Sequence, residues 1–222
     1  MSIIGSNILA GASGLPTGPA IGDSYEGGYF AGYISHTSNG VATHALIVAP
    51  AATGATGAGY TTTTMLQWRT ANNTLSGTND YDGAINTALM VANTISEFPA
   101  GNFCNGLTIN GYSDWYLPAR YELDIAYYNL KPTTSSNHTS WGINNYSVPK
   151  RTANYTSGNP TQTSVTAFQS GGAEAFSDSF HWSSTDFAPC CAWIAFFNTG
   201  MLNDYNKSQG TARVRAFRKI AV

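Results

Sequence analysis

The stretch that decides the fold is Gly111-Tyr112-Ser113-Asp114-Trp115-Tyr116-Leu117-Pro118-Ala119-Arg120-Tyr121-Glu122-Leu123. It begins with residues that favour turns, namely Gly111, Ser113 and Asp114. Trp115 and Leu117 lie two positions apart, so an extended backbone places both side chains on one face. The sequence therefore predicts a turn followed by a short extended segment whose aromatic residue is anchored in a core.

A helix is expected directly after this corner. Pro118 suits the first helical position, because its missing N–H would have no partner there. Tyr121, Ile125 and Tyr128 follow at helical spacing and form an apolar stripe. We expect the helix to span 118–130 and to stop before Pro132.

The same run resembles the G-x-S-D-W-x-L-P-x-x-x-E-L signature of a bacterial and phage domain family related to the C-terminal domain of the Lcl adhesin. Further matches follow in order along roughly 23–218: Tyr25–Phe30, His181–Thr185, Ala192-Trp193 and Val214–Arg218. The resemblance implies an α+β, C-type-lectin-like domain with two helices flanking small antiparallel sheets. It also implies that the last strand pairs with the opening strand. The structural anchors that it implies are Trp115, Pro118, Glu122, Trp182 and Arg215.

Composition narrows the classes of function. Charged residues make up only 10% of the 222 residues, against about a quarter in typical proteins. A polar but uncharged surface of this kind is frequent in extracellular and virion proteins. The net charge is −2, and there is no basic run of the kind that binds nucleic acid. No apolar stretch is long enough for a membrane span, so neither nucleic-acid binding nor membrane insertion is expected.

The three cysteines are Cys104, Cys190 and Cys191. An odd number argues against a full disulfide framework. We expect three small buried thiols, and a bridge from Cys104 to Cys190 or Cys191 is the alternative.

The first half of the chain contains strand and helix patterns. Residues 25–34 and 45–49 predict two strands joined as a hairpin near Asn39-Gly40. Residues 51–64 predict a long loop without the lysine of a phosphate-binding loop. A helix is predicted after the capping residues 79–82, with one buried stripe, and Pro99 and Gly101 are expected to end it. The stripe consists of Ile85, Leu89, Ala92 and Ile95.

The last third of the chain returns to strands. We expect strands at 180–184, 192–197, 201–205 and 211–220, with a turn at 198–200. Arg213 and Arg215 alternate with Val214 and Ala216, which predicts one solvated and one buried face in the last strand.

Residues 1–22 are expected to form a docking arm ahead of a domain at 23–222. The segment from Asn7 to Gly14 resembles the opening N-x-L-A-G-A-S-G of many phage tail-fibre and virion-appendage proteins. Asn7, Ile8 and Leu9 are the expected docking residues, and a floppy tail is the alternative. The first seven residues lack the features of a signal peptide, so we expect synthesis in a host cytoplasm and localisation to a virion.

No constellation of residues indicates catalysis. Glu122 and Asp124 lie two apart on a helix and face different directions, so a polar or capping role is expected for Glu122. Asp178, His181 and Ser183 or Ser184 lie too close along one strand for a catalytic relay. The calcium-chelating E-P-N and Q-P-D motifs of sugar-binding C-type lectins are missing, as is the copper site of formylglycine-generating enzymes. We therefore expect no enzyme activity, no metal and no cofactor.

A recognition surface is expected in the Ser/Thr/Asn-rich region 133–172, beside the hairpin at 182–205. Polar loops that carry aromatic residues on a stable scaffold are common binding sites. The candidate binding residues are Trp141, Asn144, Asn145, Tyr146, Asp186, Asn203, Asp204 and Tyr205.

These observations favour a phage virion structural protein in a tail fibre, baseplate or capsid decoration. Its expected partners are other virion proteins, a host-surface glycan or protein, and further copies of itself, with a trimer as one form. A bacterial surface adhesin or lectin of the Lcl type is the alternative, and a hydrolase is third.

Overall fold

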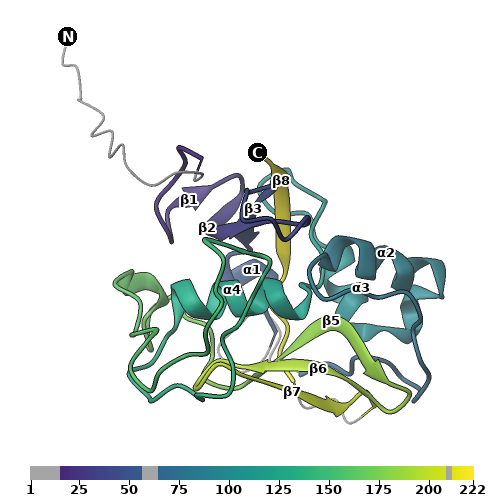
Figure 1. The fold of residues 1–222 in the computed structure, drawn as a ribbon. Helices are drawn as coiled ribbons and strands as arrows, with labels where there is room; N and C mark the ends of the chain where they lie inside the picture. Colours follow the sequence, from purple (N-terminus) through teal and green to yellow (C-terminus); the bar gives the residue numbers. More distant parts are fainter. Residues whose placement is uncertain (1–15, 57–64, 209–211) are drawn as a thin grey trace.

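The computed structural model describes residues 16–56, 65–208 and 212–222. The expected docking residues Asn7, Ile8 and Leu9 lie outside this part of the chain. The fold is α+β, with two antiparallel sheets and helix α4 (Arg120–Leu130) lying between them (Figure 1).

The first sheet joins the two ends of the domain. It contains β1 (Ser24–Tyr25), β2 (Gly28–Ile34), β3 (His44–Val48), β8 (Phe217–Ala221) and, beside β2, the short β4 (Ser147–Val148). The predicted hairpin is confirmed, because β2 and β3 pair antiparallel. The expected pairing of the last strand with the opening strand is wrong. Strands β1 and β4 pair with β2 instead, and β8 pairs with the other edge of β3.

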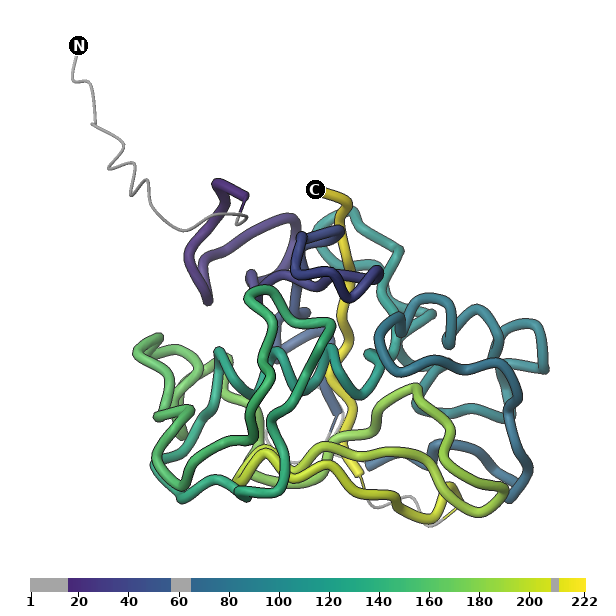
Figure 2. Tube along the Cα trace, in the orientation of Figure 1, coloured from purple at the N-terminus to yellow at the C-terminus, as the bar shows by residue number. Residues whose placement is uncertain are grey.

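The second sheet is formed by β5 (Phe180–Ala188), β6 (Cys191–Phe196) and β7 (Met201–Asn206), all antiparallel. These strands agree with the predicted ones to within a few residues. The chain then passes from the second sheet to the first, through single bridges at Ala212, Arg213 and Arg215 (Figure 2). The predicted strand at 211–220 is thus regular only at its end.

The predicted solvated face of this last segment is wrong for Arg215, which is 1% exposed. Its Nη2 lies 2.8 Å from Glu174 Oε2, and its Nε donates to Ala49 O at 2.6 Å. A buried guanidinium needs an ionic partner, and Glu174 supplies it from a loop that the local pattern does not connect to this strand.

The helices are α1 (Ala51–Gly54), α2 (Gly83–Ala92), α3 (Pro99–Asn105) and α4, with single 3-10 turns η1 (Ile95–Glu97) and η2 (Thr166–Phe168). Asp82 caps α2 by accepting from Ile85 N at 3.2 Å. The predicted stripe of α2 is right for Leu89 and Ile95, which pack against the core, and wrong for Ile85, which is 51% exposed, and for the exposed Ala92. The helix buries Asn86, Thr87 and Met90 instead. Pro99 begins α3 rather than ending α2, as a proline at a first helical position can.

Helix α4 begins at Arg120, two residues after Pro118. Glu122 caps it: Oε2 accepts from Ala119 N at 2.7 Å and from Gly83 N at 3.0 Å, which also ties α4 to α2. The stripe predicted for α4 is too narrow, because Leu123, Ala126 and Tyr127 are buried as well as Ile125.

The corner motif joins two hydrophobic clusters. Trp115 and Leu117 belong to the cluster that contains Trp68 and Trp182, whereas Tyr116 belongs to the cluster around α4. This alternation confirms the extended segment. Tyr116 N donates to Phe217 O at 2.8 Å, and Arg218 Nε donates to Asp114 Oδ1 at 2.8 Å, so β8 holds the corner in place.

Candidate recognition surface

The region 133–172 and the second sheet meet at a cleft of about 280 Å³, which we call the aromatic cleft. Its lining residues come from the start of α4, from the long loop and from β7: Arg120, Tyr121, Ser140, Trp141, Gly142, Ile143, Asn154 and Leu202. The loop and the hairpin that the sequence singled out therefore do lie together.

Arg120 is the central residue of this surface. Its guanidinium carbon lies 4.7 Å from the centroid of the Tyr121 ring and 4.4 Å from that of Trp193. Its Nη2 donates to Asp80 Oδ2 at 2.7 Å. The indole of Trp193 meets Trp141 edge-on, with ring centroids 6.1 Å apart. One cation thus fixes the rings on which a ligand could stack.

The row of aromatic rings continues beyond the cleft. Tyr121 stacks on Tyr146 with centroids 5.5 Å apart, and Tyr146 stacks on Tyr81 at 4.4 Å. On the other side, Phe187 packs edge-on against Trp193 at 5.1 Å and remains 52% exposed. Half-buried rings in a fixed row bind sugars or protein side chains at a low cost in conformational entropy.

The predicted binding residues divide into two groups. Trp141 and Tyr146 lie on this surface, half-buried, and Asn145 is exposed beside Tyr146. Asn144 is instead fully buried, donating to Asp124 Oδ2 at 2.6 Å and accepting from Ser147 N at 3.1 Å. It holds the loop in shape and cannot contact a ligand, so its prediction as a binding residue is wrong.

Asp186 is also internal, with a side chain 5% exposed. Both of its carboxylate oxygens lie 2.8 Å from Lys207 Nζ, which also donates to Ala188 O and Asn73 O. The local sequence gave no sign of this pairing, because Lys207 lies 21 residues further along the chain.

The three predicted residues of β7 alternate between the two faces of the sheet, with Asp204 on one face and Asn203 and Tyr205 on the other. Asn203 is exposed. Asp204 pairs across the sheet with Trp193, so the two side chains share a face beside the aromatic cleft. Tyr205 lies on the opposite face, with its ring 5.9 Å from that of Trp182, and packs against the core.

Arg120, Tyr121 and Trp193 were missed as surface residues. The sequence assigned them to the scaffold, because they stand in the corner motif and in a predicted strand. Of these three residues, only Trp193 has a local sequence pattern that indicates a surface position. It alternates with the buried Ala192 and Ile194, which places it on the other face of β6.

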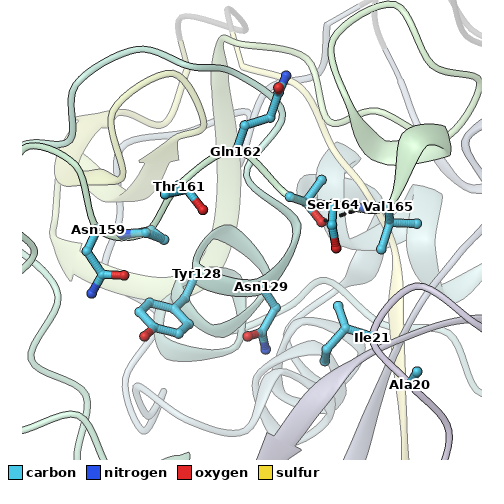
Figure 3. Close-up of a pocket in the computed structure, with 11 residues that line it drawn as sticks. Ala20, Ile21, Tyr128, Asn129, Asn159, Thr161, Gln162, Ser164 and Val165 are labelled. Carbon is cyan, nitrogen blue, oxygen red and sulfur yellow. Dashed lines mark hydrogen bonds between the residues drawn. The ribbon is translucent and has the colours of Figure 1, made fainter.

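A second cavity, of about 460 Å³, opens beside the C-terminal half of α4 (Figure 3). We call it the α4 groove. Tyr128 and Asn129 project from the helix on one side, and loop 159–165 forms the other side. Ala20 and Ile21 lie at its end.

The long loop is held by a buried cation. Lys131, which is 2% exposed, donates to Ser135 O at 2.5 Å, Asn137 Oδ1 at 2.7 Å and Pro160 O at 3.3 Å. Burial lowers its pKa from the ordinary value. Loops of this length usually lack structure of their own or serve a function, and here an ammonium group fixes one in place.

Of the candidate catalytic residues, His181, Ser183, Ser184, Glu122 and Asp124 are buried, whereas Asp178 is exposed. Burial lowers the pKa of His181 to about 3, and the Oγ atoms of Ser183 and Ser184 accept from Thr185 N and Asn86 Nδ2. Burial raises the pKa of Glu122 to about 7, and its Oε1 accepts from Tyr116 Oη at 2.7 Å. Within the described residues, no group of three or more His, Cys, Asp or Glu side chains is arranged to hold a metal ion.

The expectation of a buried thiol is confirmed for Cys104 but is wrong for Cys190 and Cys191, and the alternative bridge from Cys104 is wrong as well. Cys190 and Cys191 form a disulfide with each other at the end of β5 and the start of β6, whereas Cys104 is a free thiol in the core. The hairpin presents both neighbouring sulfurs at its end, and the packing around Cys104 keeps its thiol enclosed.

In the described part of the chain, no helix has the length and apolar character needed to cross a membrane. No protein-family model matches the chain, and no curated protein matches it.

Proposed function

We propose that the chain is a non-enzymatic phage virion protein, part of a tail fibre, baseplate or capsid decoration, whose domain recognises a host surface through the aromatic cleft. The domain is of the C-type-lectin-like class that the corner motif suggests. The observation that carries the recognition role is the cleft itself, where Arg120 holds Tyr121 and Trp193 beside Trp141.

Two features of the sequence support placement in a virion. The segment from Asn7 to Gly14 resembles the opening of phage appendage proteins, and the low proportion of charged residues is typical of particle surfaces. The arm at 1–22 would join other virion proteins, and the domain would face outward as one copy in a homo-oligomer.

A bacterial surface adhesin of the Lcl type is the second candidate. The Cys190–Cys191 disulfide favours it, because disulfides persist in oxidising compartments that exported proteins reach. An antibody against the purified chain separates the two candidates. Gold label on phage particles from a lysate supports the virion protein, whereas label confined to the surface of intact bacteria supports the adhesin.

The recognition role is tested by attachment of the purified, fluorescently labelled chain to cells of the host strain. We expect Trp141→Ala to reduce attachment at least tenfold, because the exposed side of the cleft loses its ring. Ile85→Ala is the matched control, since Ile85 is an exposed apolar residue outside the cleft. Attachment unchanged by Trp141→Ala would contradict the cleft as the site. A chelator should leave attachment unchanged, because no calcium is required.

A further inference from the structure

The α4 groove is separate from the aromatic cleft. Its lining residues are Ala20, Ile21, Tyr128, Asn129 and 159–165, and none of the described residues lines both cavities. Its volume of about 460 Å³ lies within the usual range for sites that bind small ligands.

The groove is rigid on both sides. Loop 159–165 is tied to the end of α4, because Thr163 N donates to Lys131 O at 2.9 Å and Asn137 Nδ2 donates to Pro160 O at 2.9 Å. On the helix side, Asn129 Nδ2 donates to Ala31 O at 2.7 Å. A ligand would therefore meet a preformed site and would not need to order the loop.

Asn129 presents an acceptor to the groove. Its nitrogen donates to Ala31 O, and no group in the described residues donates to its Oδ1. Thr161 adds a hydroxyl that points from the loop toward α4 (Figure 3), whereas the amide of Gln162 donates to Pro132 O at 2.7 Å and points away from Tyr128 and Asn129. A ligand rich in hydroxyl or N–H donors would bind to the oxygens of Asn129 and Thr161.

The rest of the lining also carries no formal charge, and it includes the apolar residues Ala20, Ile21, Pro160 and Val165. Asn159, Thr161 and Ser164 are exposed and add amide and hydroxyl groups. Tyr128 adds a half-buried ring whose orientation is fixed by Arg151, with the guanidinium carbon 4.5 Å from the ring centroid. Acceptors, hydroxyls and one aromatic ring without a formal charge match the chemistry of a neutral sugar.

We propose that the α4 groove binds a neutral oligosaccharide, with hydroxyl groups of the sugar donating to Asn129 Oδ1 and to the Thr161 hydroxyl and one sugar ring lying against Tyr128. This site goes beyond the proposed function, because it is a second site that the attachment role of the aromatic cleft does not need. Each site is tested by its own experiment, and a negative result for one does not contradict the other.

The test is NMR titration of the isotope-labelled chain, with the side-chain amide signal of Asn129 and the backbone amide signal of Thr161 as the readout. The probes are maltotriose, laminaritriose and chitotriose at millimolar concentration, with trigalacturonate as an acidic comparison. We expect at least one neutral trisaccharide to shift both signals. If none of the three shifts them, or if only trigalacturonate does, the proposal is wrong.

Variants show whether the groove itself is responsible. Ser164→Trp and, separately, Thr161→Trp place an indole in the groove from exposed positions and should weaken the binding at least tenfold. Thr152→Trp is the matched control, because Thr152 is an exposed loop residue outside the lining. Binding that survives both groove variants would overturn the assignment. Trp141→Ala should leave these shifts unchanged, so loss of cell attachment in that variant concerns the aromatic cleft alone.

Discussion

At the scale of single residues, His181 shows how burial determines titration. Its ring packs against the stacked pair Phe176 and Phe197, with centroids 5.5 and 4.8 Å away, and its Nδ1 lies 3.1 Å from Ser179 O. Burial is the largest cause that lowers its pKa to about 3 from an ordinary 6.5. The folded chain therefore keeps this imidazole neutral at pH values where the unfolded chain would protonate it.

This difference predicts a loss of stability in acid. Between pH 6.5 and 3 the unfolded state binds a proton at His181 that the folded state does not. The contribution of the neutral His181 to the free energy of unfolding is complete above pH 6.5, and it falls by about 1.4 kcal/mol for each pH unit below that value. His181→Phe removes the proton-binding group, so its stability relative to wild type should improve at that rate as the pH falls.

The measurement is urea unfolding of both proteins at several pH values. The difference between them cancels other titrating groups, among them Glu122, whose raised pKa acts in the opposite direction between pH 4.5 and 7. His138→Gln is the control, because His138 is exposed. A stability difference between wild type and His181→Phe that does not vary with pH would show that His181 is solvated in the folded protein.

At the scale of elements, the long loop 133–172 depends on interior polar contacts. Its regular structure is limited to β4 and η2. Lys131 and Asn137 connect the end of α4 to Ser135 and Pro160, and Tyr127 Oη donates to Asn137 Oδ1 at 2.6 Å. One ammonium group therefore donates to three acceptors of the loop, and it shares Asn137 Oδ1 with Tyr127 and Pro160 O with Asn137.

Lys131→Met should loosen the loop while leaving the sheets intact. The apolar side chain leaves Ser135 O without the Lys131 donor and leaves Asn137 Oδ1 with Tyr127 Oη alone, at a cost of about 1–3 kcal/mol. Hydrogen–deuterium exchange followed by mass spectrometry should show that the exchange rate increases over wild type more in 133–165 than in β5 and β6. Lys150→Met is the matched control, since Lys150 is exposed. Equal exchange in the two variants would mean that the loop does not need the buried cation.

At the scale of the whole molecule, the two hydrophobic clusters are coupled. Neighbouring residues of β2 and β3 contribute to different clusters, for example Ile47 to the one around Trp115 and Leu46 to the one around α4. The corner motif does the same through Trp115 and Tyr116. We therefore expect the domain to unfold in one transition, because neither cluster can be lost without its shared strands.

Trp115→Ala tests this coupling. Trp115 is 2% exposed, and removal of a buried tryptophan costs about 3–5 kcal/mol. Denaturant unfolding should show this loss in one transition, at the same midpoint by far-ultraviolet circular dichroism and by tryptophan fluorescence. Ile85→Ala, on an exposed helix face, should change the stability by less than about 0.5 kcal/mol. Two separate transitions in Trp115→Ala would show that the clusters fold independently.

The sequence alone determined the local parts of this protein. The alternation of Trp115, Tyr116 and Leu117, the β2–β3 hairpin, the strands of the second sheet and the cap of α2 at Asp82 all follow from spacing and turn chemistry within a few residues. Such patterns are readable because neighbouring residues along the chain set the backbone conformation directly. The sequence also predicted that the loop 133–172 lies beside the second sheet, and the contact between Trp141 and Trp193 confirms this.

Only the tertiary structure decided which distant residues meet. The pairing of β8 with β3, the burial of Arg215 against Glu174 and the internal roles of Asn144 and Asp186 have no local signal. Arg120 and Trp193 lie far apart in the sequence, and they become neighbours because α4 packs between the two sheets. Burial and charge pairing depend on contacts between residues that are distant in the sequence. An Asp or Asn that the sequence predicts at the surface can therefore be buried and hydrogen-bonded in the structure.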